Sequence, residues 1–318
     1  MLNKTRIVII GIGGVGGYFG GLLSKKYTSG NDVEVVFVAR GEHLKEIQNK
    51  GLTVIKGNDS FVTKPYLATD DYSKIGVADY IIICTKSYDL KQTIEKLKPL
   101  INHSTILLPF LNGVSASEEI LEILPHANVL KGCAFIVSKI KSPGIIENSG
   151  NIQKLSFGMD GALSDEVLQL KDLMFDAGID VTVSDKISTA IWEKFIFISP
   201  TATSTSYFDS TIGKVLEEHL ETVLELIEEV KNLALAKDVT ISDDISDKTL
   251  NTMKSMPYEV TSSMHRDYLN QKQQTEVESL TGYIVREAEK LGIAAPTYHK
   301  LYEGLLKKKD RCKSLKIR

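Results

Sequence analysis

Three glycines with the spacing G-x-G-x-x-G follow the apolar run Ile7 to Ile10 near the beginning of the chain. In this pattern the first glycine permits a tight turn, the second lets the backbone approach a pyrophosphate closely, and the third lets a helix pack against the preceding strand. Free N–H groups at the helix N-terminus then bind the phosphates. The sequence therefore predicts a dinucleotide-binding loop whose binding residues are Gly11, Gly13, Gly14, Val15 and Gly16.

The end of the next strand-like run, Val33 to Ala39, bears on the choice between NAD and NADP. An NAD site usually has an acidic residue there, which binds the ribose 2′-hydroxyl. This chain has Arg40 instead, and a guanidinium suits a 2′-phosphate because the two form charge-assisted hydrogen bonds. Arg40 therefore favours NADP(H). The alternative is a solvated arginine at a strand end, and Glu42, close behind it, complicates the assignment.

Polar residues also follow two later strand-like runs. Lys86 comes after Tyr80–Cys84, and Asn112 comes after Thr105–Leu108. Ligands of open parallel sheets bind beyond the carboxyl ends of the strands, so both residues are candidates for the site. Their alternative explanations are a surface lysine and a turn formed by Asn112 with Gly113.

Lys194 lies in the otherwise apolar segment Ile187 to Ile198, which predicts a helix. Lysine is rarely fully buried unless it is paired. A partly desolvated lysine in a cleft suits the role of a general acid, because burial lowers its pKa towards neutrality. The alternative is a side chain whose ammonium group extends to solvent along the helix surface.

Further candidates lie in the C-terminal half. Glu276 begins a predicted helix, Thr275 to Leu291, where a carboxylate also simply stabilises the helix N-terminus. Ser262 and Ser263 stand together, and an N-cap is their alternative role. The hydroxyl-rich run Thr201 to Ser206 is expected to be either a loop or the polar lining of a cleft.

Length and composition limit the classes of protein to consider. The 318 residues suggest about two domains, and 42% hydrophobic residues suffice for a sizeable core. A formal net charge of −3 gives no reason to expect a nucleic-acid partner. Three scattered cysteines, no signal peptide and no apolar run of transmembrane length predict a cytoplasmic protein that does not enter a membrane. The six histidines have no metal-ligand spacing, so no metal is expected.

Strand and helix patterns alternate up to about Asp185, which predicts a doubly wound parallel sheet of the Rossmann type. The patterns after that point are helical throughout. We therefore expect an α/β fold with a nucleotide-binding domain over residues 1–185 and an all-helical substrate domain over residues 186–318. The cleft between the two domains is the expected ligand site.

The expected elements can be given by residue range. In the first domain, strands are expected at 33–39, 80–84, 105–108 and 129–137, helices at 89–100 and 115–124, and edge strands at 152–159 and 179–183 around a helix at 164–177. In the second, helices are expected at 187–198, 214–236 and 275–291. The apolar stripe of the helix at 214–236 would be buried either within the domain or in a homodimer interface.

Taken together, these segments resemble ketopantoate reductases (2-dehydropantoate 2-reductases) over essentially the whole chain. The family reduces the 2-keto group of ketopantoate with NADPH and so provides pantoate for the synthesis of pantothenate and coenzyme A. Besides the glycine loop, the resemblance rests on the order and spacing of Val38-Ala-Arg40-Gly41, Cys84-Thr-Lys86, Leu111-Asn112-Gly113, Trp192-Glu-Lys194-Phe195, and Thr261-Ser-Ser-Met264 followed by Thr275-Glu276.

The resemblance also implies roles for individual residues. Lys194 would be the general acid that protonates the nascent alkoxide, and Glu276 would orient the substrate or the lysine by hydrogen bonds. Asn112 and Lys86 would line the site beside the nicotinamide. Ser263 would help to bind the substrate.

Three positions depart from the family pattern, which usually has asparagine where this chain has Ile198, Ala202 and Val260. The identity of the 2-keto acid therefore stays open. Either the hydroxyls at 201–206, such as Thr203, replace the missing contacts, or the chain is a 2-hydroxy acid dehydrogenase of the same fold with a less polar substrate. A protein that senses NADPH without turnover is a third option, but the retention of both Lys194 and Glu276 argues against it, because a sensor needs no general acid.

Overall fold

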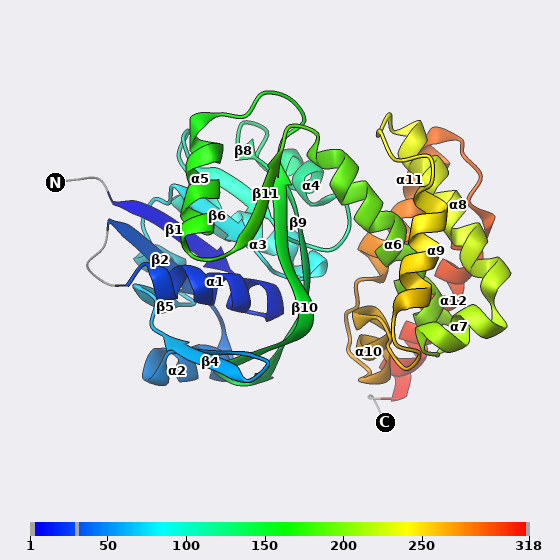
Figure 1. Cartoon of the computed structure of the whole chain (residues 1–318), viewed down its shortest axis with the longest axis horizontal. Coiled ribbons are helices and arrows are strands. Elements are labelled where there is room, and N and C mark those ends of the chain that lie inside the picture. Colours follow the sequence, from blue (N-terminus) through cyan, green and yellow to red (C-terminus); the bar gives the residue numbers. More distant parts are fainter. Residues whose placement is uncertain (1–3, 29–31, 316–318) are drawn as a thin grey trace. The chain divides into compact units, whose positions relative to one another are not determined.

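The structure is a computed structural model that describes residues 4–28 and 32–315, with the side chains of the last helix described up to Lys308. The chain separates into two compact units (Figure 1). Unit 1 comprises the residues up to Leu111 together with Ala116–Ile187. Unit 2 comprises Asn112–Ser115 together with the residues from Ser188 onward.

Unit 1 contains a six-stranded sheet in which neighbouring strands are parallel. The strand order reverses between β1 and β6, and such a sheet binds its ligand beyond the carboxyl ends of the strands at this switch point. The predicted Rossmann-type sheet is thereby confirmed. In spatial order the strands are β5 (Leu67–Thr69), β2 (Val33–Val38), β1 (Thr5–Ile10), β6 (Tyr80–Ile83), β7 (Ile106–Pro109) and β8 (Asn128–Val129).

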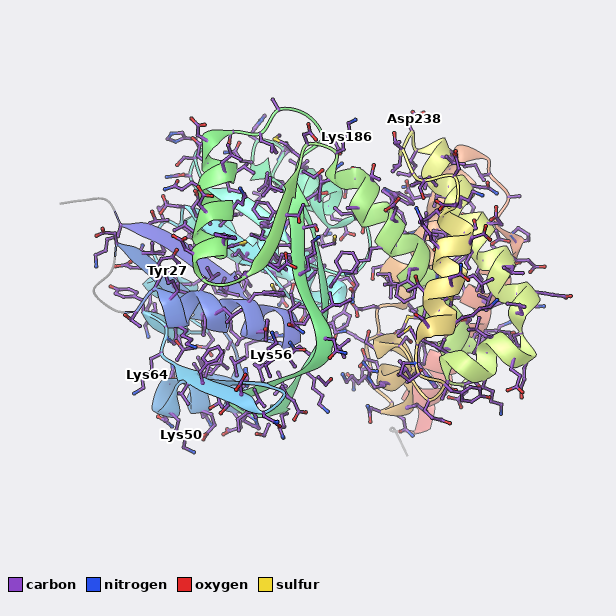
Figure 2. The ribbon with its side chains drawn as sticks, viewed as in Figure 1. Tyr27, Lys50, Lys56, Lys64, Lys186 and Asp238 are labelled. Carbon is purple, nitrogen blue, oxygen red and sulfur yellow. The ribbon has the colours of Figure 1, made fainter. Side chains whose placement is uncertain are left out.

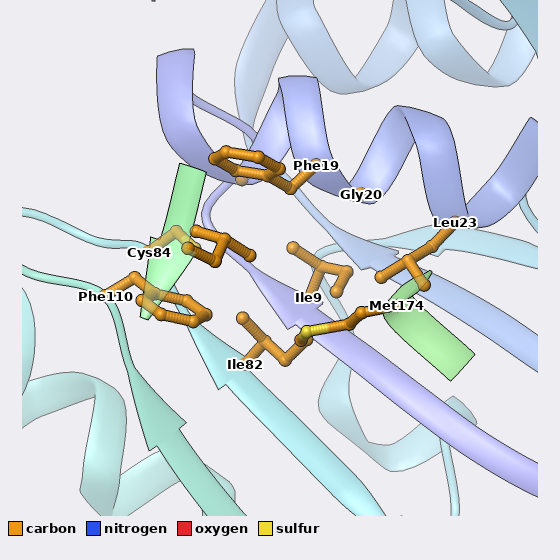
Figure 3. A pocket seen from close by; sticks show the side chains of 10 residues that line it. Ile9, Phe19, Gly20, Leu23, Ile82, Cys84, Phe110 and Met174 are labelled. Carbon is orange, nitrogen blue, oxygen red and sulfur yellow. The ribbon is translucent and has the colours of Figure 1, made fainter. Parts of the chain in front are cut away.

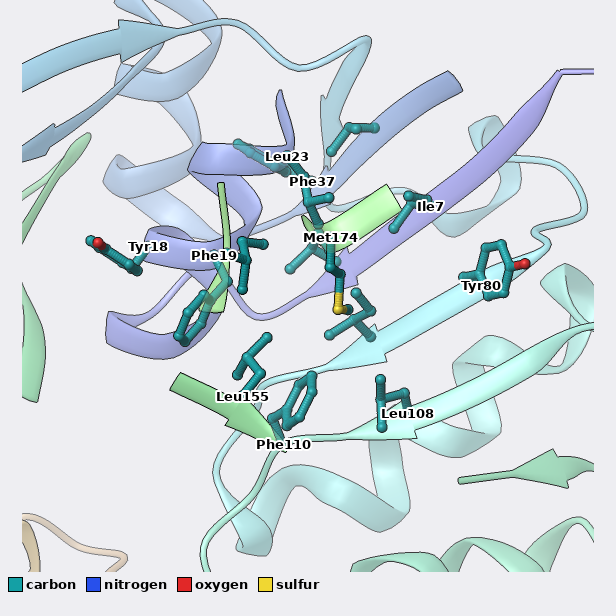
Figure 4. Close-up of a cluster of buried hydrophobic side chains, with 14 of the residues drawn as sticks. Ile7, Tyr18, Phe19, Leu23, Phe37, Tyr80, Leu108, Phe110, Leu155 and Met174 are labelled. Carbon is teal, nitrogen blue, oxygen red and sulfur yellow. The ribbon is translucent and has the colours of Figure 1, made fainter. Parts of the chain in front are cut away.

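Both faces of this sheet are buried, which explains why its central strands are almost continuously apolar. On β1, Ile7 and Ile9 face one core cluster, whereas Val8 and Ile10 face another on the opposite side. Figure 4 shows side chains of α1 meeting Ile7 and its neighbours in the first cluster. The helical elements of unit 1 are α1 (Gly14–Lys26), α2 (Gly41–Lys50), α3 (Leu90–Leu97), α4 (Ala116–Ile123), α5 (Asp165–Asp176) and the short 3₁₀ turns η1 (Tyr72–Lys74), η2 (Ser87–Asp89) and η3 (Lys98–Leu100).

A second, five-stranded sheet in unit 1 was not expected from the sequence. Two of its strands are the predicted edge strands, which pair in parallel with each other here and not with the first sheet. The predicted strand at 129–137 is divided, because β8 belongs to the first sheet and β9 pairs antiparallel with β10 in the second. The strands are β3 (Leu52–Lys56), β4 (Asp59–Thr63), β9 (Lys131–Ser142), β10 (Ile145–Gly158) and β11 (Asp180–Ser184).

Many charged side chains lie on the surface of unit 1. Lys50, Lys56 and Lys64 are exposed and are labelled in Figure 2. Lys50 pairs with Glu46 on the same helix, at 2.8 Å. Basic and acidic side chains are therefore interspersed in this region.

Unit 2 is all-helical, as predicted, and its helices enclose one apolar core. Val223, Ile227 and Val230 of the apolar stripe of α8 lie in that core, whereas Leu220 and Leu224 of the same stripe are exposed. None of the helices among the described residues is long and apolar enough to cross a membrane. The elements are α6 (Ile187–Phe208), α7 (Ile212–Glu218), α8 (Leu220–Ala236), α9 (Ile245–Ser255), α10 (Ser263–Leu269), the π-helical turn η4 (Glu278–Gly282), α11 (Tyr283–Leu291) and α12 (Pro296–Leu315).

Two helix predictions in unit 2 were wrong in extent. Helix α6 continues past Ile198 through the run Thr201 to Ser206, so the expectation of a loop there is wrong. The hydroxyls of Thr201, Ser204 and Thr205 bond backbone carbonyls one turn earlier, as Thr201 does to Phe197 at 2.7 Å. The predicted helix at 214–236 is interrupted at His219, whose ring stacks on Phe208 with centroids 3.6 Å apart.

Candidate functional site

The glycine loop leaves β1 at the carboxyl edge of the parallel sheet. Gly11 has φ +91°, a conformation that favours glycine, and its N–H donates to the Val38 carbonyl at 3.0 Å. A Cβ on Gly16 would lie 2.2 Å from the Gly11 carbonyl oxygen. The first and third glycines therefore serve the turn and the close packing of α1 on β1.

Gly13 differs, because a Cβ placed on it would meet no atom within 4 Å. Gly13 is also the N-cap of α1, where no side chain caps the helix and the first turn carries no acidic residue. The N–H groups and the positive end of the helix dipole are thus available to an anion. These features fit the pyrophosphate of a dinucleotide.

Arg40 directly follows β2 and is the N-cap residue of α2. Its side chain is 74% exposed, and its Nη2 lies 3.0 Å from Oδ2 of Asp89. Burial raises the pKa of the Tyr72 hydroxyl, and the charge of Arg40 opposes that rise. The guanidinium is therefore accessible at the strand end where a ribose 2′-phosphate would need it.

In the segment after β6, Thr85 is a candidate that the residue types and spacing alone did not indicate. Lys86 is half-buried at the start of η2. Next to it, the Thr85 hydroxyl is buried and meets no hydrogen-bond partner, which is unusual because such a group loses its bonds to water. Cys84 is half-buried, and burial raises the pKa of its thiol to about 12, so the thiol stays protonated. Thr85 is thus an additional candidate beside the glycine loop.

An apolar gap lies beneath the loop, between α1 and the sheet. Figure 3 shows Leu23 of α1 directed towards Ile9 of β1, and Phe19 of α1 and Ile82 of β6 also line the gap. Met174 of α5 closes the gap. The lining is apolar throughout, so the gap belongs to the core that supports the loop and not to a ligand site.

In unit 2, Lys194 is half-buried on α6. Its neighbours Trp192 and Phe195 are buried, with ring centroids 6.3 and 5.9 Å from that of Tyr283. Further along α6, Ser199 donates to the Leu280 carbonyl of η4 at 2.8 Å. These contacts fix α6 against the segment that carries Glu276.

Glu276 immediately precedes η4 and is only 2% exposed. Its carbonyl accepts hydrogen bonds from the backbone of Leu280 at 3.0 Å and from the Ser279 hydroxyl at 3.1 Å. Beside it, the Thr275 hydroxyl is buried without a hydrogen-bond partner. Glu276 thus stands next to a π-helical turn, a feature often found at functional sites.

The loop that carries Asn112 packs against the same turn. Gly113 has φ +102°, and a Cβ on it would lie 3.2 Å from the Ser279 carbonyl oxygen. Asn112 is half-buried. Asn112, Lys194 and Glu276 are therefore carried by elements of one unit, although Asn112 comes early in the chain.

Ser263 is the first residue of α10 and is half-buried. The N-cap is Ser262, whose hydroxyl accepts from the His265 N–H at 3.0 Å, as its alternative role predicted. Thr203 is fully buried, and its hydroxyl bonds that of Thr281 at 2.8 Å. The expectation that Thr203 contacts the substrate is therefore wrong, because its hydroxyl ties α6 to η4.

The residues at the three departing positions contribute to the apolar core of unit 2. Ala202 is 3% exposed, and Ile198 and Val260 are partly buried against the same cluster. Ile198 and Ala202 follow Lys194 on α6 at helical spacing. Among the residues that the structure describes, no group of three or more histidine, cysteine or acidic side chains could hold a metal ion.

Comparison with protein families gives matches over most of the chain. The family described as "Ketopantoate reductase PanE/ApbA" matches residues 7–161. The family described as "Ketopantoate reductase PanE/ApbA C terminal" matches residues 186–309. The two matches are consecutive in the chain. The two structural units are also consecutive, apart from Asn112–Ser115, which belongs to unit 2.

Individual relatives agree with these matches. An uncharacterized oxidoreductase of Bacillus subtilis, YkpB, is 33% identical over 305 residues, covering 94% of this chain and 97% of the relative. A 2-dehydropantoate 2-reductase of Streptococcus pyogenes serotype M3 is 27% identical over 297 residues, covering 91% and 93%. The crystal structure of 2-dehydropantoate 2-reductase from Porphyromonas gingivalis W83 has a TM-score of 0.84 at 35% identity, covering 95% of this chain and 99% of the other.

Proposed function

The chain belongs to the ketopantoate reductase family, and on that premise we propose that it reduces ketopantoate to pantoate with NADPH. The resemblance found in the sequence is thereby confirmed, and with it the class: an oxidoreductase that uses a pyridine nucleotide. The choice of NADPH, the substrate and the place in pantothenate and coenzyme A synthesis are the proposal. It is carried by one observation, the half-buried Lys194 in the same unit as the buried carboxylate of Glu276.

Unit 1 is proposed to hold the coenzyme. The open side of Gly13 and the uncapped N-terminus of α1 would take the pyrophosphate. Arg40 would bind the 2′-phosphate of the adenosine ribose in place of its present partner, Asp89. Lys86 and the unpartnered Thr85 hydroxyl would contact the coenzyme beyond β6. When bound, the reduced nicotinamide supplies the hydride.

Unit 2 is proposed to supply the proton. Transfer of a hydride to the ketone carbon leaves negative charge on the oxygen. A nearby ammonium group lowers the activation barrier in two ways, because it stabilises that charge and donates the proton. Lys194 is the proposed donor. Glu276 is proposed to orient the lysine or the substrate, and Asn112 and Ser263 to hold the substrate through their polar side chains.

One alternative substrate class is favoured by a specific observation. Ile198, Ala202 and Val260 place apolar groups where the family pattern has asparagine, and all three contact the apolar core. A 2-keto acid with a larger apolar chain would gain from such surroundings, and a polar one would lose hydrogen-bond partners. The same proton donor would serve either substrate.

The experiment is a panel of 2-keto acids, including ketopantoate, assayed with NADPH and with NADH by the loss of reduced-coenzyme absorbance. We expect the highest kcat/KM for ketopantoate with NADPH. Turnover of only a more apolar 2-keto acid would support the proposed reaction but assign a different substrate to the protein. Tight NADPH binding without turnover of any panel member would instead favour a sensor.

Arg40→Ser tests whether the protein prefers NADPH to NADH through this arginine. Loss of a charge-assisted hydrogen bond to phosphate should raise the Kd for NADPH by roughly ten-fold or more, and leave that for NADH nearly unchanged. Lys45→Ser, on the exposed face of the same helix, is the matched control. Equal effects of Arg40→Ser on both coenzymes would contradict the proposed role.

Cellular location and assembly complete the proposal. A cytoplasmic location is proposed and is supported by the reduced thiol of Cys84, since a reducing compartment keeps cysteines out of disulfides. The side chain of Cys312 lies outside the described residues. The homodimer stays a prediction, which light scattering of the purified protein would test.

A further inference from the structure

One hydrogen bond joins the turn between β9 and β10 to the helix that follows Arg40. The Gly144 N–H donates to Nδ1 of His43 on α2, with 2.9 Å between the nitrogens. Because Nδ1 accepts this bond, it carries no proton, so the imidazole is neutral with its proton on Nε2. Nε2 is buried without a hydrogen-bond partner. Burial lowers the pKa of His43, and the nearby backbone of Ile12 in the glycine loop opposes that shift.

Gly144 holds its N–H in a fixed direction. Its φ is +76°, and a Cβ on it would lie 2.9 Å from the Glu46 Cβ on α2. Its carbonyl accepts a hydrogen bond from Thr53 of β3 at 2.9 Å. The turn is therefore fastened to the second sheet on one side and to α2 on the other.

The same hairpin also contacts the beginning of α1. A Cβ on Gly14 would lie 2.2 Å from the Ser138 carbonyl oxygen of β9. A Cβ on Gly17 would lie 2.6 Å from the Ile146 side chain of β10. The β9–β10 hairpin thus lies directly against the helix N-terminus that is proposed to bind the pyrophosphate.

We propose that His43 is a positioning residue for the coenzyme, which holds α2 and the glycine loop against the β9–β10 turn. The loop N–H groups and Arg40 would then keep the spacing that the pyrophosphate and the ribose require. This inference rests on the proposed function, because it concerns the affinity of the same site. Burial lowers the pKa of His43, which keeps the imidazole in the neutral form that the hydrogen bond requires. On the same helix, Glu42 pairs with Lys45 and Glu46 pairs with Lys50.

Two substitutions test the roles of the two ring nitrogens of His43 separately. In His43→Asn, the side-chain oxygen can take the place of Nδ1 and accept the Gly144 N–H. In His43→Gln, the amide reaches the place of Nε2, and the Gly144 N–H loses its acceptor. We expect His43→Asn to bind NADPH within about three-fold of the wild type and His43→Gln to bind about ten-fold more weakly, the effect of one lost hydrogen bond. The kcat at saturating NADPH should be unchanged in both, because His43 is not among the groups proposed to touch the substrate or the transferred proton.

Controls distinguish positioning from general packing. His126→Gln makes the same change at an exposed histidine and should leave NADPH binding unchanged. Melting temperatures are measured for each variant. Equal NADPH affinities of the wild type, His43→Asn and His43→Gln would overturn the inference, and so would equal losses of affinity and melting temperature in both variants.

The failure of the inference can be told apart from the failure of the proposed function. A wild type that binds neither NADPH nor NADH would overturn both. The imidazole tautomer can also be read without coenzyme, from the ¹⁵N shifts of His43 in the free protein. Protonation on Nε2 is expected, and a proton on Nδ1 would overturn the inference and leave the proposed function intact.

Discussion

Replacement of Gly13 by alanine should weaken coenzyme binding without weakening the fold. The backbone of Gly13 is extended, with φ −87° and ψ −155°, and so lies outside the left-handed region that favours glycine. A Cβ there would meet no protein atom within 4 Å. Glycine-to-alanine changes at such positions stabilise a protein by about 0.4–1 kcal/mol, because they restrict the unfolded chain. The melting temperature of Gly13→Ala should therefore be equal to or slightly above that of the wild type.

The unfavourable effect of Gly13→Ala should appear only in the affinity for NADPH, because the added methyl group meets nothing until the coenzyme binds. The added methyl group points into the space where the pyrophosphate would approach the loop, and would hold the phosphates away from the helix N-terminus. Loss of one charge-assisted hydrogen bond costs about 1.5–3 kcal/mol, which corresponds to a rise in the Kd for NADPH of about 10- to 150-fold. Fluorescence titration with NADPH measures this rise, and thermal unfolding of the same sample measures stability.

Gly16→Ala is the matched control for Gly13→Ala. Its Cβ would lie 2.2 Å from the Gly11 carbonyl oxygen, so the loop itself must shift, and we expect a lower melting temperature. An undiminished affinity for NADPH in Gly13→Ala would refute the reasoning, because it would mean that the pyrophosphate does not approach this glycine. A large loss of stability in the same variant would refute the geometry of the loop.

Three further predictions concern catalysis, stability and pH. Lys194→Ala should lower kcat by about 10²- to 10⁴-fold, the usual contribution of a general acid, with the Kd for NADPH unchanged; retained turnover would remove the lysine from the mechanism. Glu229→Ala should lower the free energy of unfolding by about 2 kcal/mol in urea titrations, because the buried Glu229 carboxylate accepts the N–H groups of Thr297 and Tyr298 at 2.8 Å each; Glu229→Gln should lose less. Burial lowers the pKa of His43 from its usual 6.5, so the unfolded chain binds this proton more readily, and the stability present above pH 6.5 should fall as the pH falls through the lower folded value. His43→Asn should show a smaller loss of stability than the wild type between about pH 7.5 and about pH 5.5, and identical losses would contradict the assignment.

The sequence was sufficient to predict the parallel sheet because its strands are buried on both faces and are therefore apolar throughout. Runs such as Ile7–Ile10 and Ile81–Ile83 need no knowledge of their neighbours to be recognised. The second sheet was missed for the opposite reason. The register of β9 on β10 depends on a long hairpin with an irregularity between Asn148 and Gln153, and no local pattern encodes that pairing.

The errors in unit 2 have a similar origin. The hydroxyls of Thr201 to Ser206 looked incompatible with a helix, but in the structure several of them bond to carbonyls of their own helix. The break at His219 accompanies the stacking of its ring on Phe208, the last residue of α6. Neither feature is visible in a short window of sequence.

The residues of the candidate site also differ in whether the local sequence was enough to identify them. Residue types and spacing identified the glycine loop, Arg40 and Lys194, because each stands out from its immediate neighbours. Thr85 and His43 did not stand out, since their interest comes from burial and from partners far along the chain. Resemblance to a family singled out Glu276, and the structure adds that its carboxylate is buried beside a π-helical turn.

The most direct test of the central claim is to follow the hydride itself. The wild-type protein would be incubated with ketopantoate and NADPH carrying deuterium at both C4 positions of the nicotinamide, and the product analysed by mass spectrometry. Our account predicts pantoate that carries one deuterium at C2, and none in the Lys194→Ala variant over the same time. Absence of pantoate, or pantoate without deuterium, would contradict the proposed reduction of ketopantoate by NADPH.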